Sequence, residues 1–192
     1  REPAAVMGSY SLGSDIAAMP STALLAPLGR VLFPMFVELR DDLAKLKRAM
    51  LLALGIQTLV GIPAGVGLVL VASEIVRALL GEKWLSAVPF LQIIGAFNIT
   101  YAIGSSGGYM LLALGRAKIS ALGAGASVLL FATLATAVFP HAGAADIATL
   151  RLAVAAFGLV TLYFLVKREL RTLRVREVVA SIWRPCVASV AM

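Results

Sequence analysis

The chain is divided into apolar stretches, each long enough to cross a bilayer, separated by short segments that carry most of its charges. A membrane-spanning helix needs about 20 mainly apolar residues. Hydrophobic residues make up 60% of the chain and charged residues 14%, whereas ordinary soluble domains are about 25% charged. The sequence therefore predicts an all-α membrane protein, a polytopic bundle of transmembrane helices.

Five full spans and the start of a sixth can be placed along the chain. We predict them at about residues 9–38, 49–73, 87–114, 119–139 and 147–166, with the sixth beginning near residue 178. We interpret residues 1–192 as one partial transmembrane domain. Because the chain opens on Arg1 and stops inside an apolar stretch, we expect it to be a fragment of a longer protein.

The positive charges predict an orientation, because cytoplasmic loops of membrane proteins are rich in Lys and Arg. Alternate connections hold twelve of these residues and the opposite connections hold four. The richer set is Arg40, Lys45, Lys47, Arg48, Arg116, Lys118, Lys167, Arg168, Arg171, Arg174, Arg176 and Arg184. We place this set in the cytoplasm. The same placement argues against nucleic acid as a partner, although the net charge is +7.

Two further stretches have the composition of segments at a membrane surface. One is residues 74–88, where Trp84 suits the headgroup region. The other is residues 168–182, where arginines alternate with leucines and could attract anionic lipid. The alternative for residues 168–182 is a plain connection that sets topology.

Three segments, in this order, resemble the polysaccharide flippases. They read YSLGSDIAAMPSTALLAPLGRVLFPMFVELRDD, IPAGVGLVLVASEIVRALLGEKWLSAVPFLQIIG and LLALGRAK. The most specific parts are residues 10–12, 34–42 and 80–84. These flippases are the Wzx-type lipopolysaccharide-biosynthesis proteins of the multidrug/oligosaccharidyl-lipid/polysaccharide exporter superfamily, and the resemblance covers nearly the whole chain.

The resemblance implies a fold and an activity. The family fold is two six-helix lobes around a central cavity with two further helices, and this chain resembles most of the second lobe. The implied activity is translocation of undecaprenyl-diphosphate-linked oligosaccharide across the bacterial inner membrane by alternating access. The implied partners are this lipid-linked substrate, membrane lipids, the missing first lobe and polysaccharide polymerase machinery.

Four prolines mark expected helix kinks: Pro20, Pro27 and Pro34 in the first span, and Pro63 in the second. A proline costs about 3 kcal/mol in a helix interior. Within a membrane such breaks are tolerated where neighbouring helices or a water-filled cavity satisfy the freed carbonyl groups. Kinked helices of this kind are a feature of transporters.

Arg30 is the first candidate for the substrate path. On a helical wheel it lies about 60° from Pro27 and about 40° from Pro34, so the charge and the prolines share a face. An intramembrane Arg usually faces a cavity or a partner, and there it could hold a diphosphate. The alternative is snorkelling toward the interface near Glu38, about 12 Å along the axis.

Asp15, Asn98, Tyr101 and Ser105 are the other substrate-path candidates. Asp15 could pair with a cation or titrate, or it could simply be exposed near the helix mouth. The polar residues of the third span could contact sugar hydroxyls, or they could form hydrogen bonds between helices. Gly104 and Gly108 predict close helix packing, as in other membrane pairs of this spacing.

An intramembrane serine protease of the rhomboid type is a remote alternative. The sequence Gly104-Ser105-Ser106-Gly107 contains the protease motif, and His141 follows two helices later. His141 is the single histidine, however, so the upstream histidine of an oxyanion hole is missing. His141 also follows Pro140 in a stretch typical of a turn. We therefore predict that the protein is not an enzyme.

Another exporter of the same superfamily, handling a drug or a lipid precursor, is the nearer alternative. We expect no cofactor, because the chain contains no P-loop sequence. A single histidine and a single cysteine, Cys186, leave no cluster for a structural zinc site. We therefore expect no metal.

Overall fold

The computed structural model describes residues 26–79, 81–138 and 144–190. Within these ranges the regular structure is helical throughout. The helices are α2 (Ala26–Glu38), α3 (Leu43–Leu70), α4 (Ala72–Leu79), the 3₁₀ helix η2 (Glu82–Ala87), α5 (Val88–Ala113), α6 (Ala117–Val138), α7 (Ala144–Glu169) and α8 (Val175–Val190). This confirms the predicted all-α class.

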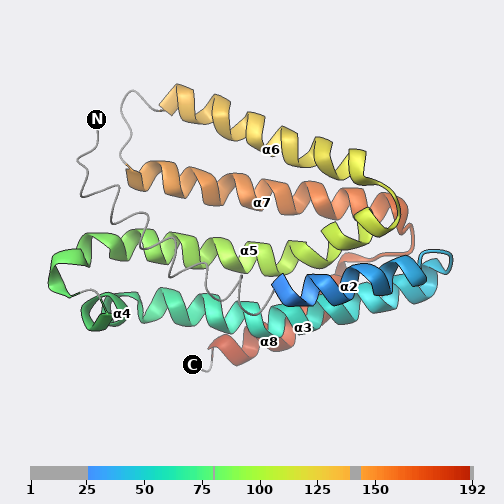
Figure 1. Ribbon diagram of the computed structural model, residues 1–192, viewed down its shortest axis with the longest axis horizontal. Helices are drawn as coiled ribbons and strands as arrows, with labels where there is room; N and C mark the ends of the chain where they lie inside the picture. The colour runs from blue at the N-terminus through green and yellow to red at the C-terminus, as the bar shows by residue number, and fades with distance from the viewer. Residues whose placement is uncertain (1–25, 80, 139–143, 191–192) are drawn as a thin grey trace.

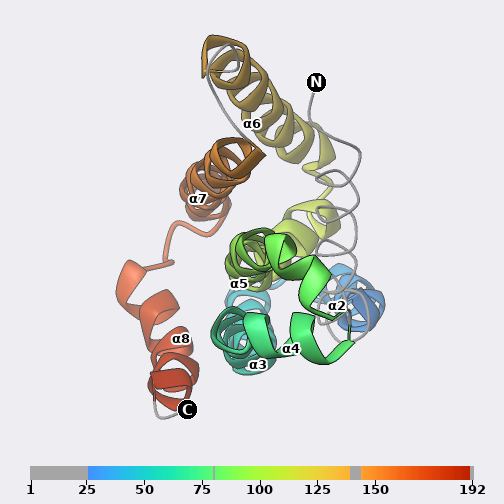
Figure 2. The ribbon, with the colours of Figure 1, turned by 90° about the vertical axis from the view of Figure 1, so that its left-hand side faces the viewer.

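The four longest helices, α3, α5, α6 and α7, run side by side along the long axis of the molecule (Figure 1). Seen along that axis, they follow one another as α6, α7, α5 and α3, with α2 and α8 on opposite sides of the α3 end (Figure 2). All four are long and apolar enough to cross a membrane. The chain is therefore a multi-pass membrane protein.

Four of the predicted spans overlap these helices. The second to fifth overlap α3, α5, α6 and α7, with boundaries that differ by one to six residues. For the first span, the structure describes only the part in α2, because residues 9–25 lie outside the described residues. The five-span count therefore stays a prediction.

Two of the four prolines lie inside helices. Pro34 is within α2 and Pro63 is within α3, and both helices continue through them. Pro27 is the second described residue of α2. Pro20 lies outside the described residues. The kinks at these positions stay predictions.

Local sequence signals fix where α3 begins. The Asp42 carboxylate accepts hydrogen bonds from the backbone N–H groups of Ala44 (3.1 Å) and Lys45 (3.0 Å). A side chain that satisfies the first amides of a helix in this way stabilises its N-terminus by about 1 kcal/mol. These same hydrogen bonds, with the Lys45 ammonium 3.2 Å away, lower the pKa of Asp42.

A glycine ends α5 and turns the chain into α6. Gly115 has φ of +71°, a left-handed conformation that glycine adopts without steric cost. The Arg116 N–H donates to the Leu111 carbonyl at 2.9 Å and the Gly115 N–H donates to the Leu112 carbonyl at 3.0 Å. This pair of bonds is the Schellman motif, which satisfies the last carbonyl groups of a helix.

The helix α8 begins at Val175, slightly before the predicted residue 178, and packs along α3. Lys47 of α3 forms an ion pair with Glu177 of α8 at 2.7 Å and donates to the Thr172 carbonyl at 2.9 Å. The other Glu177 oxygen accepts from the Arg174 N–H at 2.9 Å, which caps α8. Residues 175–182 therefore pack on α3 rather than forming only a connection.

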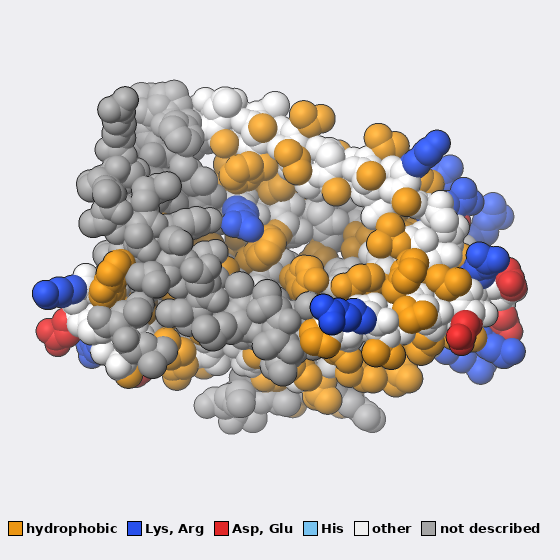
Figure 3. Space-filling model, viewed as in Figure 1, with side chains coloured by type: hydrophobic (Ala, Val, Ile, Leu, Met, Phe, Trp, Pro, Cys, Tyr) orange, Lys and Arg blue, Asp and Glu red, His pale blue; other side chains and the backbone are white. Residues whose placement is uncertain are grey.

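The connections α2–α3, α5–α6 and α7–α8 all lie at one end of the bundle, which we call the basic end (Figure 1). Most of the predicted cytoplasmic charges lie in these connections or in the adjoining helix turns, whereas Arg184 lies well inside α8. Besides Lys47–Glu177, an ion pair of 3.1 Å joins Arg116 to Glu169 at this end. Figure 3 shows charged side chains gathered mainly at the two ends, with apolar side chains covering much of the body between them.

The most extensive helix interface is between α3 and α5. A methyl group added to Gly65 would lie 2.5 Å from Cγ1 of Ile99 and 3.1 Å from the carbonyl oxygen of Gly95. Small residues allow membrane helices to approach in this way. Gly67 on the same helix has open space beside it, with nothing within 4 Å.

We expect Gly65→Ala to destabilise the fold by about 1–3 kcal/mol, because the added methyl group overpacks the α3–α5 contact. Gly67→Ala is the matched control, and we expect it to be neutral or to stabilise by about 0.5–1 kcal/mol through helix propensity. Reversible unfolding in mixed micelles measures both. Equal effects of the two substitutions would contradict the close contact.

The Glu177 ion pair predicts acid sensitivity. The hydrogen bond from Lys47, with the Arg174 amide, lowers the pKa of Glu177, so its ionised form stabilises the fold above the unfolded pKa of about 4.3. That contribution is lost as the pH falls through the lowered folded pKa. The thermal unfolding midpoint of the wild type should therefore fall between pH 7 and a pH below about 4. In Glu177→Gln the same change of pH should lower the midpoint by less. Glu82→Gln, at the opposite end of the bundle, is the control. Its unfolding midpoint should change with pH as that of the wild type does.

Candidate functional site

The two faces of α2 differ sharply. Gly29, Leu32 and Phe36 are buried against the bundle, mainly against α5. Pro27, Arg30 and Pro34 are exposed. The face that carries the charge and the prolines is therefore the face turned away from the described helices, as the helical wheel predicts.

Gly29 allows α2 to lie against Tyr109 of α5. A methyl group added to Gly29 would overlap the phenol oxygen and ring of Tyr109. Any larger residue at position 29 would push α2 away from α5 or displace the Tyr109 side chain. Arg30 is the next residue, so the base of its side chain lies beside this contact.

A row of polar side chains runs along α5 toward that contact. Asn98, Tyr101, Ser105 and Tyr109 follow one another at spacings of three, four and four residues, which places them within about 80° of one face. We call these four residues the α5 polar row. The row therefore ends next to Gly29 and Arg30.

Members of the α5 polar row differ in burial. Asn98 is 7% exposed and takes part in an interaction within the bundle, whereas Tyr101 is 40% exposed. The Ser105 hydroxyl is half-buried and donates to the carbonyl of Ala102 at 3.4 Å, within its own helix. Tyr101 is thus the member most accessible to a ligand.

Of the predicted site residues, the structure brings Asn98, Tyr101 and Ser105 onto one helix face. Arg30 follows Gly29, which lies against Tyr109, but the Arg30 side chain is exposed on the other face of α2. Asp15 lies outside the described residues. Sequence reasoning missed Tyr109, although its spacing of four residues from Ser105 was a usable signal. No group of three or more His, Cys, Asp or Glu that could hold a metal ion occurs in the described ranges.

The two serines of the GSSG sequence lie in different environments. Ser105 belongs to the α5 polar row, whereas Ser106 is 2% exposed and faces the interior. His141, which the protease alternative requires, lies outside the described residues.

The glycine packing prediction for this segment is half correct. A methyl group on Gly104 would lie 2.9 Å from Cδ2 of Leu159 on α7, so Gly104 does allow a close contact. Gly108 has nothing within 4 Å, and the prediction for it is wrong. The second contact with α7 comes instead from Gly107, one residue before Gly108. A methyl group added there would lie 3.2 Å from Cγ2 of Val166. The rotation of α5 about its axis decides which glycine faces α7, and the GxxxG spacing alone does not predict that rotation.

A buried amide lies at the middle of α3. Gln57 is fully buried, and neither its amide nitrogen nor its amide oxygen has a hydrogen-bond partner among the described residues. The adjacent Thr58 is equally buried, but its hydroxyl donates to the Leu54 carbonyl at 2.7 Å. An unpaired buried polar group costs about 1–3 kcal/mol, so Gln57 is an energetic liability in this fold.

The architecture defines a helical, multi-pass membrane protein with a charged and proline-containing face on α2. Comparison with known proteins narrows this class. Residues 3–89 match the family described as polysaccharide biosynthesis protein. No solved structure matches the chain.

Three curated relatives have informative names. The lipopolysaccharide biosynthesis protein WzxC of Escherichia coli (strain K12) is 29% identical over 95% of this chain and 37% of its own length. The teichuronic acid biosynthesis protein TuaB of Bacillus subtilis (strain 168) is 32% identical over 61% of this chain and 24% of its own length. The succinoglycan biosynthesis transport protein ExoT of Rhizobium meliloti (strain 1021) is 29% identical over 45% of this chain and 18% of its own length.

The chain is therefore similar to polysaccharide biosynthesis proteins, and the resemblance predicted from its sequence is confirmed. It spans about a third of the length of WzxC.

Replacing the unpaired amide should stabilise the protein. We expect Gln57→Met, which keeps the shape of the side chain, to raise the free energy of unfolding by about 1–3 kcal/mol. Thr58→Val is the matched control, because it removes a buried hydroxyl that is hydrogen-bonded, and it should not stabilise. Unfolding in mixed micelles measures both. A loss of stability in Gln57→Met would show that the amide is paired in the folded protein.

Proposed function

We propose that the whole protein is a flippase that moves lipid-linked oligosaccharide across the bacterial inner membrane. The observation that carries this proposal is the similarity over 95% of the chain to a protein named for lipopolysaccharide biosynthesis. The succinoglycan relative is named a transport protein, which supports transport rather than catalysis. The four apolar helices suit this role.

We assign Arg30 the role of binding the anionic part of the substrate. It is exposed on a helix that the sequence places at membrane depth, where an uncompensated charge is costly unless it faces water or a partner. A diphosphate would be such a partner, since guanidinium groups bind phosphates through two parallel hydrogen bonds. The prolines on the same face fit a helix that borders a cavity.

The α5 polar row is suited to the sugar part of the substrate. Tyr101, its most exposed member, offers a hydroxyl and an aromatic ring. Because the row ends beside Gly29, a ligand whose phosphate contacts Arg30 could extend its glycan along α5. Asp15 and the other residues before α2 remain candidates for the same path.

The orientation follows from charge. The basic end would lie in the cytoplasm under the positive-inside rule, and α2 would then run toward the cytoplasm. Alternating access would require movement of this helical unit against the rest of the protein, which we expect to supply a first lobe. Polysaccharide polymerase machinery is a further expected partner.

Export of another compound by a related protein is the second candidate. The confirmed resemblance favours polysaccharide precursors over drugs, because the relatives are named for lipopolysaccharide, teichuronic acid and succinoglycan. The protease alternative has no support from these names.

Arg30→Ala in the full-length protein should reduce glycan export at least tenfold, if it removes one charge-assisted contact worth about 1.5–3 kcal/mol. Arg30→Lys should retain partial activity, because it keeps the charge but loses the two-point geometry. Export is measured as surface glycan per unit of protein in the membrane. The matched control is Arg48→Ala, an exposed cation at the basic end, which should export normally.

Three results would speak against this role. Normal export by Arg30→Ala would exclude anion binding by Arg30. Full activity of Arg30→Lys together with a low membrane level of Arg30→Ala would indicate snorkelling, since either cation can reach the interface. Equal losses in Arg30→Ala and Arg48→Ala would indicate a general effect of charge on topology.

A further inference from the structure

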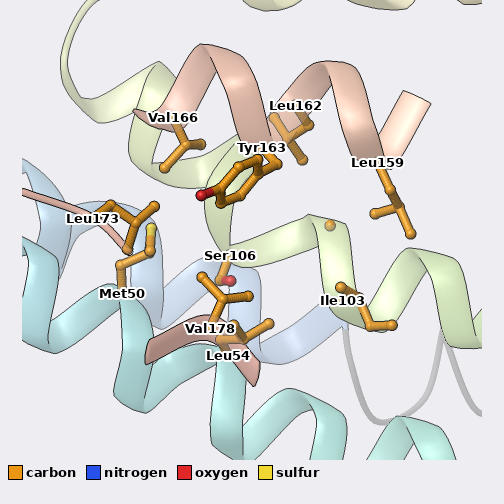
Figure 4. A pocket seen from close by; sticks show the side chains of 12 residues that line it. Met50, Leu54, Ile103, Ser106, Leu159, Leu162, Tyr163, Val166, Leu173 and Val178 are labelled. Atoms are coloured by element: carbon orange, nitrogen blue, oxygen red, sulfur yellow. The ribbon is translucent and has the colours of Figure 1, made fainter. Parts of the chain in front are cut away.

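The helix α8 has different surroundings on its two sides. On one side, Val178 lines a pocket of about 80 Å³ together with Met50 and Leu54 of α3 and with residues of α5 and α7 (Figure 4). On the other side there is an open groove of about 510 Å³. Among the described residues, only those of α3 and α8 line this groove. We call it the α3–α8 groove.

The lining of the α3–α8 groove is mainly apolar and uncovered by the described helices. On α3 it includes Leu52, Ile56 and Leu59, which are exposed and follow one another at spacings of four and three residues. On α8 it includes Trp183, which is also exposed. The volume lies in the range of ligand sites, about 300–1,000 Å³. In a membrane protein such a groove is filled by a lipid chain or by another helix.

Two arginines lie at the end of the groove that belongs to the basic end. Arg48 precedes Leu52 by four residues on α3, and Arg176 precedes Ala180 by four residues on α8. Residues four apart share a helix face. Each arginine therefore continues the line of groove residues on its own helix, and both side chains are exposed.

The ion pair between Lys47 and Glu177 places these arginines at about the same level along the bundle. Lys47 precedes Arg48, Glu177 follows Arg176, and the paired atoms are 2.7 Å apart. The Lys47 ammonium is occupied by the Glu177 carboxylate and by the Thr172 carbonyl. Neither Arg48 nor Arg176 forms an ion pair with a described residue. Two guanidinium groups at this level are thus left for an anion from outside the described helices.

The two arginines also lie where lipid phosphates are expected. Arg48 directly precedes the predicted second span, residues 49–73, and Arg176 precedes the predicted start of the sixth near residue 178. From Arg48 to Leu59, the last α3 residue in the groove, the distance along the helix axis is about 16 Å. That is close to half of the hydrocarbon core, which is about 30 Å thick. The groove therefore has the depth of one leaflet.

We propose that the α3–α8 groove binds one anionic phospholipid of the leaflet at the basic end. The lipid phosphate binds Arg48 and Arg176, since guanidinium groups form charge-assisted hydrogen bonds with phosphate. One acyl chain lies along Leu52, Ile56 and Leu59. Each arginine favours a headgroup with net negative charge over a zwitterionic one by about fivefold. The proposal does not depend on what the whole protein transports.

The composition of residues 168–182 indicates attraction for anionic lipid but gives no location for it. The packing of α8 on α3 selects Arg176 from that segment and adds Arg48, which is distant in sequence. Because a bilayer supplies phospholipid in excess, the loss of one arginine lowers the affinity without emptying the site. Export by Arg48→Ala should therefore still be normal.

Quenching of Trp183 by brominated phospholipids tests the site in the full-length protein. Bromine on an acyl chain quenches a tryptophan only on contact, and the emission of the wild type minus that of Trp183→Phe isolates the Trp183 signal. Brominated phosphatidylglycerol, which is anionic, should quench this signal at a mole fraction about 10- to 30-fold lower than zwitterionic brominated phosphatidylcholine does. Arg48→Gln and Arg176→Gln should each reduce this preference about fivefold, and the double variant should abolish it.

The matched control is Lys118→Gln, which removes an exposed cation at the same end of the bundle from α6, a helix that does not line the groove. It should keep the preference of the wild type. Absence of quenching by either lipid would show that another part of the protein covers the groove. Equal quenching by both lipids would show unselective contact with the bilayer, and equal effects of Lys118→Gln and Arg48→Gln would show a general effect of surface charge. Each of these three results would overturn the proposal.

Discussion

The contact between α3 and α5 is the one on which the rest of the structure depends. Gly65 and Gly95 let these helices approach closely, and the other helices then pack on this pair: α2 and α7 on α5, and α8 on α3. In a bilayer, apolar surface alone gives helices little reason to associate, so packing geometry must hold them together. A change in the spacing of α3 and α5 would thus move α2, and Arg30 with it.

Electrostatics fixes the basic end independently of this packing. Arg116–Glu169 joins the α5–α6 connection to the end of α7, and Lys47–Glu177 joins α3 to α8. Glu177 has two functions, because it also caps α8 through the Arg174 amide. Its position decides where α8 starts and directs that helix along α3.

Much of this fold could be predicted from the sequence because the bilayer imposes it. Hydropathy predicts where the long helices lie, and the Lys and Arg residues predict which connections share a side of the membrane. Asp42 and Gly115 are recognisable signals for the start of α3 and the end of α5. Contacts that depend on helix rotation could not be predicted, since apolar residues are spread around both α3 and α5 and do not single out the face that packs. The Gly29–Tyr109 contact, the open space at Gly108 and the pocket between α3, α5, α7 and α8 all depend on that rotation. That Arg30 shares a face with Pro27 and Pro34 could be predicted from their spacing, whereas what this face borders stays a prediction.

The uncovered surfaces of α2 and α6 differ in a way that suggests different surroundings. Leu122, Val128 and Leu129 of α6 are exposed, and from Ile119 to Thr136 the helix carries no charge. Such a surface suits lipid. The exposed surface of α2 includes the apolar Val31 and Phe33 but also carries Arg30, a charge that lipid would solvate poorly. If α6 faces the bilayer, the α2 face on the opposite part of the bundle is the one available to water, substrate or the rest of the protein.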